Sequence, residues 1–107
     1  MSIVGNDGLF NGVQVSPIVF AVTLPPGTYK KGMLLGKVGL LHNLIGEATF
    51  APETVNAVLS EDVVLKSEGE ASAYFEGEFD LKKLITKEGT EVSDVIDHAR
   101  KLRIFIG

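Results

Sequence analysis

Apolar and polar side chains alternate with a period of two over residues 72–79. One side of this pattern carries Ala73, Phe75, Gly77 and Phe79, and the other carries Ser72, Tyr74, Glu76 and Glu78. Alternation of this kind predicts a half-buried strand. Asp80 then offers a helix cap, and apolar residues follow at helical spacing: Leu81, Leu84 and Ile85. We therefore expect Phe79 to point into the core just before a short helical turn.

Further strands are predicted wherever β-branched and aromatic residues gather. These segments are residues 18–24, 33–38, 47–50, 55–59 and 63–65. Pro26 and Gly27 encode a turn, and Gly36 inside its strand indicates a bulge or a close backbone approach. The polar stretch 66–70 predicts a hairpin between residues 63–65 and 71–79.

The carboxy-terminal third predicts a helix over residues 91–101, with Thr90 as its cap. Its apolar stripe is Val92, Val95, Ile96, Ala99 and Leu102. The apolar tail Ile104, Phe105 and Ile106 is expected to be buried, either as a terminal strand on its own subunit or against a neighbouring subunit. It is therefore a candidate subunit interface. Residues 39–46 fit a loop or a hairpin arm.

The amino-terminal residues 1–16 combine turn formers with apolar side chains. The apolar residues are Ile3, Val4, Leu9, Phe10, Val13 and Val15. They fit either a loosely docked terminal strand or a flexible arm that orders by adding a strand to a partner's sheet. The pattern predicts such an arm followed by one mainly β domain over residues 17–107, small and clip- or barrel-like, with a C-terminal helix.

Composition narrows the classes of function. The chain has 107 residues, a formal net charge of −4, twelve glycines and no cysteine. Its ten basic residues are scattered, which argues against a nucleic-acid surface. The absence of cysteine excludes disulfides and thiolate metal sites. No apolar run approaches the ~20 residues that span a bilayer, and no secretory signal begins the chain, so we expect a soluble protein.

Catalytic or cofactor chemistry finds little support in the residues. His42 and His98 belong to no spaced metal-ligand motif, so no metal or cofactor is expected. The segment Gly32 to Lys37 is one residue short of a phosphate loop and lacks the Ser or Thr after its lysine. The serines lack a nucleophile-elbow context. Carboxylates at turns favour solubility over acid–base catalysis, which needs two of them in one cleft.

Four stretches together resemble the head decoration proteins of tailed, lambda-type bacteriophages. They are residues 24–27 with 31–38, residues 57–63, residues 77–81 with Leu84, and residues 92–106. Each motif is common alone, and their order and spacing carry the resemblance over residues 24–106. Residues 39–50 match none of the motifs.

The resemblance implies a capsid-stabilising structural protein without enzymatic activity. Such a protein forms homotrimers on the outer surface of the expanded head and clamps the major capsid protein, in a virion or prophage context, after assembly in the host cytoplasm. The alternative is a small β-barrel that binds a ligand or sugar, or acts as an enzyme, with Glu76, Glu78 and His42 as its candidate residues.

Overall fold

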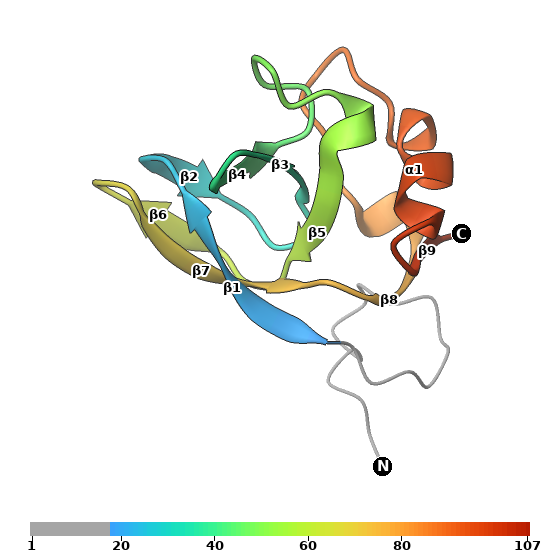
Figure 1. Ribbon diagram of the computed structural model, residues 1–107, viewed down its shortest axis with the longest axis horizontal. Coiled ribbons are helices and arrows are strands. Elements are labelled where there is room, and N and C mark those ends of the chain that lie inside the picture. Colours follow the sequence, from blue (N-terminus) through green and yellow to red (C-terminus); the bar gives the residue numbers. More distant parts are fainter. Residues whose placement is uncertain (1–17) are drawn as a thin grey trace.

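The computed structural model describes residues 18–107, and this part of the chain is mainly β. Its largest element is a five-stranded antiparallel sheet with the strand order β1-β7-β5-β3-β4 (Figure 1). The strands are β1 (Val19–Leu24), β7 (Gly69–Tyr74), β5 (Val55–Leu59), β3 (Leu34–Val38) and β4 (Leu41–Leu44). The strands predicted at residues 18–24, 33–38 and 55–59 are therefore confirmed, and residues 39–46 form the second arm of a hairpin.

The middle strands of this sheet are buried on both faces. Leu34 on β3, Val58 on β5 and Tyr74 on β7 lie in one register and point to one side. These three side chains belong to the helix-side core, which consists of Leu34, Ile45, Val55, Val58, Tyr74, Phe79, Leu84, Val95, Ala99 and Ile104. Because successive residues of a strand point to opposite faces, their neighbours must fill a second core.

That second core, the ribbon-side core, lies on the other face of the sheet. Its members are Val22, Leu24, Tyr29, Leu35, Ala57, Leu59, Ala71 and Ala73. Burial on both faces explains why successive residues are apolar at Leu34 and Leu35 on β3 and over residues 57–59 on β5. It also explains Tyr74, which the period-two pattern assigned to the polar side and which is 5% exposed in the helix-side core.

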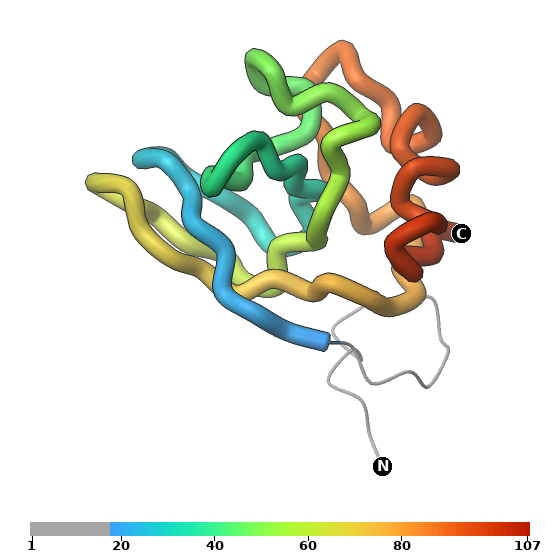
Figure 2. Tube along the Cα trace, viewed as in Figure 1, coloured from blue at the N-terminus to red at the C-terminus, as the bar shows by residue number. Residues whose placement is uncertain are grey.

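The ribbon-side core is closed by a bent two-stranded ribbon. Strand β2 (Gly27–Tyr29) pairs with β6 (Val63–Leu65), and this pairing continues the ladder of β1 with β7 across two adjacent corners. The corners are Pro25-Pro26 on one strand and residues 66–68 on the other. Figure 2 shows these two segments of the chain turning back at their tips on the left. Met33, Val63 and Leu65 then pack against the ribbon-side core.

The helix-side core is covered by the last third of the chain (Figure 1). Strand β8 (Gly77–Phe79) pairs in parallel with β9 (Ile104–Ile106). The connection between them contains the 3-10 turns η3 (Leu81–Lys83) and η4 (Val92–Asp94) and the helix α1 (Ile96–Arg100). As predicted, Asp80 caps the turn after Phe79, accepting a hydrogen bond from the Lys82 amide at 2.9 Å.

Several local predictions are wrong. Residues 63–65 and 71–79 do not form a hairpin with each other, because β6 pairs with β2 while β7 pairs with β1 and β5. Residues 71–79 are also two strands, separated by a bend at Phe75 and Glu76 that moves the chain from the sheet to β8. Residues 47–50 form a turn, in which the Phe50 amide donates to the Glu47 carbonyl, and a 3-10 turn, η2 (Pro52–Thr54), follows.

The predicted helix over residues 91–101 is shorter than expected. Its first turn is the 3-10 turn η4, and only Ile96–Arg100 is α-helical. Glu91, not Thr90, is the cap: its amide and the Asp94 side chain form one half of a reciprocal capping box. The buried residues of the predicted stripe are Val95 and Ala99, whereas Leu102 is 40% exposed.

Gly36 marks both a bulge and a close approach, as its position in a strand predicted. The register between β3 and β5 shifts from Leu35 opposite Ala57 to Gly36 opposite Val55, which leaves Asn56 as the extra residue. A Cβ on Gly36 would lie 2.2 Å from Thr54 Oγ1 and 2.9 Å from Ile45 Cδ1. The bulge therefore aims Asn56 to the ribbon-side face, and a side chain at residue 36 would collide with η2.

Replacing Phe79 tests the helix-side core. Phe79 is fully buried, so Phe79→Ala should lower the free energy of unfolding by about 3 to 5 kcal/mol. Phe105→Ala is the matched control, because Phe105 lies on the paired strand β9 and is 41% exposed. Urea unfolding curves of the two variants would measure the difference. An unchanged midpoint for Phe79→Ala would contradict the assigned burial.

Replacing Gly36 tests the close approach at the bulge. Gly36→Ala should destabilise the fold by about 1 to 3 kcal/mol, since the new methyl group must displace Thr54 and Ile45. Gly69→Ala is a milder control, where the nearest atom is the flexible end of Leu65 at 3.1 Å. Adding Thr54→Ala to Gly36→Ala should recover part of the loss. Thermal melts that show equal stability for Gly36→Ala and wild type would disprove the collision.

Candidate functional site

The apolar arm residues Ile3, Val4, Leu9, Phe10, Val13 and Val15 lie outside the described residues. The described chain begins where this segment ends, and its first residues are unusually exposed for their type. Ile18 is 41%, Val19 is 47% and Phe20 is 61% exposed. We call these three residues the β1 apolar start. It offers apolar surface at residues that closely follow the predicted arm in the sequence.

The terminal residues proposed as a subunit interface are divided between core and surface. Ile104 is fully buried in the helix-side core, so it has no surface to offer a neighbour. Phe105 is 41% exposed and Ile106 is partly buried against the same core. The three residues form strand β9 on β8 of the same chain, which is one of the two positions predicted for this tail.

Glu76 and Glu78 line a small hollow of about 120 Å³ beside β9. Its other lining residues are Gly77, Arg103 and Phe105, and His42 is not among them. Glu76 Oε1 lies 3.5 Å from Arg103 Nε, and both side chains are well exposed. Solvent weakens such an ion pair, so it adds little stability, and with Glu78 the lining carries two carboxylates and one guanidinium.

His42 sits in a different environment, on β4 at the ribbon-side face. It is 5% exposed, and its Nε2 lies 2.6 Å from Asn56 Oδ1. Because the amide oxygen can only accept, Nε2 carries the proton and donates it. The other ring nitrogen, Nδ1, is buried and has no hydrogen-bond partner in the described structure. The bulge in β5 is what brings Asn56 to this ring.

An aromatic pair, Phe75 and Phe20, lies next to His42. Phe75 meets the imidazole edge to face, with ring centroids 6.2 Å apart, and Phe20 meets Phe75 in the same way at 5.7 Å. Burial lowers the pKa of His42, and Lys37, its partner in register on β3, lowers it further, while the hydrogen bond with Asn56 acts in the opposite direction. His42 is therefore a neutral imidazole at pH 7.

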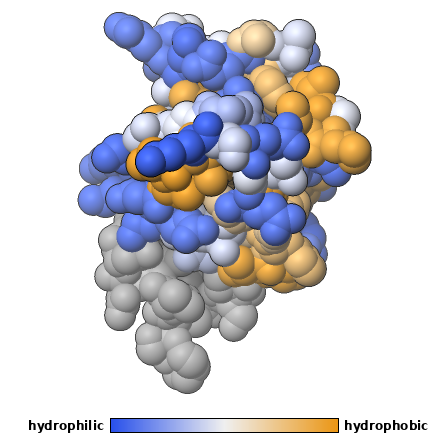
Figure 3. Space-filling view, turned by 90° about the vertical axis from the view of Figure 1, so that its left-hand side faces the viewer, coloured by the Kyte–Doolittle hydropathy of each residue, from blue (hydrophilic) through white to orange (hydrophobic). Residues whose placement is uncertain are grey.

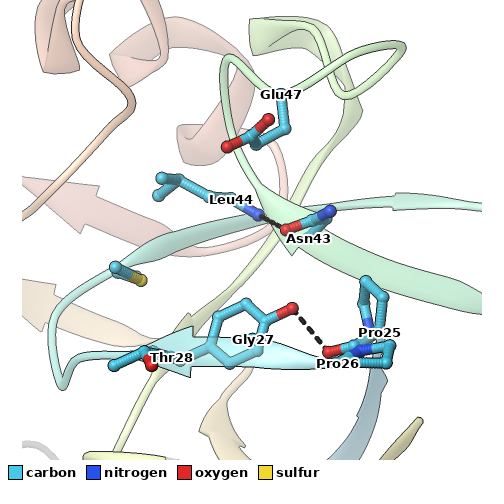
Figure 4. A pocket seen from close by; sticks show the side chains of 9 residues that line it. Pro25, Pro26, Gly27, Thr28, Asn43, Leu44 and Glu47 are labelled. Carbon is cyan, nitrogen blue, oxygen red and sulfur yellow. Dashed lines mark hydrogen bonds between the residues drawn. The ribbon is translucent and has the colours of Figure 1, made fainter. Parts of the chain in front are cut away.

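A larger pocket of about 400 Å³ opens between the ribbon corner and β4. Figure 4 shows Pro25 and Thr28 on one wall and Asn43, Leu44 and Glu47 on the facing one. Tyr29, another lining residue, donates from its hydroxyl to the Pro25 carbonyl at 2.7 Å. Sequence reasoning missed this pocket. The sequence predicted the turn at Pro26 and Gly27, which forms one wall. It did not predict the facing wall, because residues 39–46 fitted either a loop or a hairpin arm.

Several polar groups that line this pocket interact with other groups of the protein. The pKa of Tyr29 is raised by burial and secondarily by the charge of Glu47, so its hydroxyl stays protonated at neutral pH. The Glu47 carboxylate itself is held by Lys87 at 3.0 Å. Asn43 Oδ1 accepts from the Leu44 amide at 2.8 Å. The Tyr29 hydroxyl, the Glu47 carboxylate and the Asn43 amide oxygen are thus each engaged within the protein.

Neither a metal centre nor a membrane span is found in residues 18–107. No three His, Cys, Asp or Glu side chains in that range lie close enough together to hold a metal ion. No helix there is long and apolar enough to cross a bilayer.

Figure 3 shows the face that carries the ribbon corner, where apolar patches are separated by polar side chains. Exposed Val64 on β6 belongs to this corner.

Comparisons of the sequence with known protein families and with curated proteins find no match.

Proposed function

We propose that the chain is a structural protein of a tailed-phage head, which binds the outside of the expanded capsid as a homotrimer and stabilises the head. The four stretches that resemble decoration proteins support this proposal through their place in the fold. All the largest fully buried side chains except Ile45 come from these stretches: Phe79, Leu24, Leu34, Leu35, Leu59, Ile104, Val58 and Val95. The resemblance therefore concerns the residues that build both cores.

The single observation that carries the proposal is the β1 apolar start. Phe20 is 61% exposed, and burying a side chain of this size contributes about 1.5 to 3 kcal/mol. Isolated apolar side chains on a surface are normal, but here three are successive, and they follow the predicted arm in the sequence after Ser16 and Pro17. Three adjacent exposed apolar side chains suit a protein whose activity is to bury surface between subunits.

The partners proposed are a second and third copy of the chain and the major capsid protein. The net charge of −4 is compatible with an outer surface that faces solvent over a DNA-filled head. Glu76 and Glu78 line a small hollow that His42 does not share, so the three candidate residues of the ligand-binding or enzymatic alternative do not form one site. The proposed site of action is the outer capsid surface of the virion, after assembly in the host cytoplasm.

Light scattering coupled to size exclusion tests the trimer. The expected mass is three times the 11.5 kDa of one chain. Phe20→Asp should shift the mass toward the monomer, because a carboxylate cannot be buried unpaired at an apolar contact. Val64→Asp is the matched control, since Val64 is 67% exposed at the ribbon corner, at the other end of β1 from the β1 apolar start. A monomeric mass for the wild type at all concentrations would contradict a trimer in solution.

Deleting residues 2–15 tests head binding. The truncated chain should keep its melting temperature and lose most of its co-sedimentation with expanded heads that lack a decoration protein. A second variant keeps the full length but carries serine at Ile3, Val4, Phe10 and Val13, which separates the loss of apolar side chains from the loss of length. Binding equal to wild type by both variants would place attachment elsewhere, and unfolding of the truncated chain would make the arm a core strand.

A further inference from the structure

His42 closes one end of the ribbon-side core and is a polar group where the rest of that core is apolar. Asn56 from β5 and Phe75 from the bend after β7 contact the imidazole ring. Phe20 from β1 contacts Phe75. Strand β4 also lies beside β1, although the two strands are not hydrogen-bonded neighbours in the sheet. We call this junction the β1–β4 seam.

The seam is built for a neutral imidazole. A second proton would go to Nδ1, which is buried and has no acceptor in the described structure. A charged donor without a partner in a buried position is strongly unfavourable. Among residues 18–107, the groups around the ring supply no compensating charge. Lys37 on β3 is a cation, Asn56 on β5 is neutral, and Glu76 after Phe75 is paired with Arg103.

The seam is also the part of this sheet that can open at least cost. Strand β4 is an edge strand that pairs only with β3, whereas β5 and β7 each have partners on two sides. Phe75 is only partly buried and Phe20 is 61% exposed, so parting them from His42 disturbs few buried contacts. The helix-side core lies on the opposite face and takes no part in this contact.

We propose that His42 is an acid-sensitive latch: gain of a second ring proton opens the β1–β4 seam, releasing β4 from Phe75 and the start of β1 while β5 and β7 stay paired. The direction follows from linkage. The pKa of His42 is lowered in the closed state and returns to its ordinary value of about 6.5 in the open one. The closed seam is thus fully stable above about pH 6.5 and loses stability as the pH falls below that value. This proposal does not depend on the proposed function.

Amide hydrogen exchange between pH 7 and pH 5, corrected for the intrinsic pH dependence of exchange, tests the latch. In the wild type, protection of β4 amides should fall by about tenfold for each pH unit between the open-state and closed-state pKa values of His42. Protection in β5 and β7 should change much less. In His42→Gln the fall in β4 should disappear, because glutamine can still donate to Asn56 and has no second proton to gain. His98→Gln should behave as wild type, since His42 is intact.

A second measurement keeps the proposal testable if His42→Gln does not fold. Imidazole ¹⁵N resonances of the wild type report the protonation of His42 directly, and they should show Nε2 protonated at pH 7 and a second proton gained only together with loss of β4 protection. Titration of His42 without any change in β4 would overturn the latch. So would an equal loss of protection in β4, β5 and β7, because it would mean global unfolding.

Discussion

The fold depends on burying both faces of one small sheet. Leu34 and Leu35, neighbours on β3, are both fully buried, and they point into different cores. Each core uses the backbone of β3, β5 and β7 as one wall, so we expect the stability of each to depend on the other. The bent ribbon of β2 and β6 covers one face, and β8, β9 and α1 cover the other. Loss of either cover would expose the apolar side chains on that face of the sheet to water. The sheet would then lose the burial that stabilises its strand pairing.

This arrangement determines where function can lie. The central strands are committed to packing, so the available surface is at the ends and edges: the β1 apolar start, the hollow beside β9, the pocket at the ribbon corner and the seam around His42. These sites share few groups poised for covalent or acid–base chemistry. Glu47 and Glu76 are each paired with a cation, and His42 is a buried neutral donor. This distribution is compatible with the function proposed above.

The sequence predicted local features well where short-range chemistry decides them. Asp80 caps a turn, Gly36 marks a bulge and Phe79 is buried, and each depends on the residue and its immediate neighbours. Strand partners were predicted wrongly, because pairing of β6 with β2 is decided by the corner at Pro25-Pro26 and not by the polar loop that follows β6. The burial of Tyr74 was not predicted, because the period-two interpretation assumes that one face of the sheet is exposed to solvent. His42 and Asn56 could not be connected without the bulge that turns Asn56 toward the ring.

The central claim is that two cores on opposite faces of one sheet fold as a single cooperative unit. The chain reports on this directly, because its two tyrosines lie in different cores: Tyr29 in the ribbon-side core and Tyr74 in the helix-side core. Labelling the full chain with 3-fluorotyrosine gives one ¹⁹F resonance for each core, and both can be followed through the same urea titration. The account predicts that the two resonances lose their folded intensity at one shared midpoint. Separate midpoints for Tyr29 and Tyr74 would show that the cores unfold independently and would contradict it.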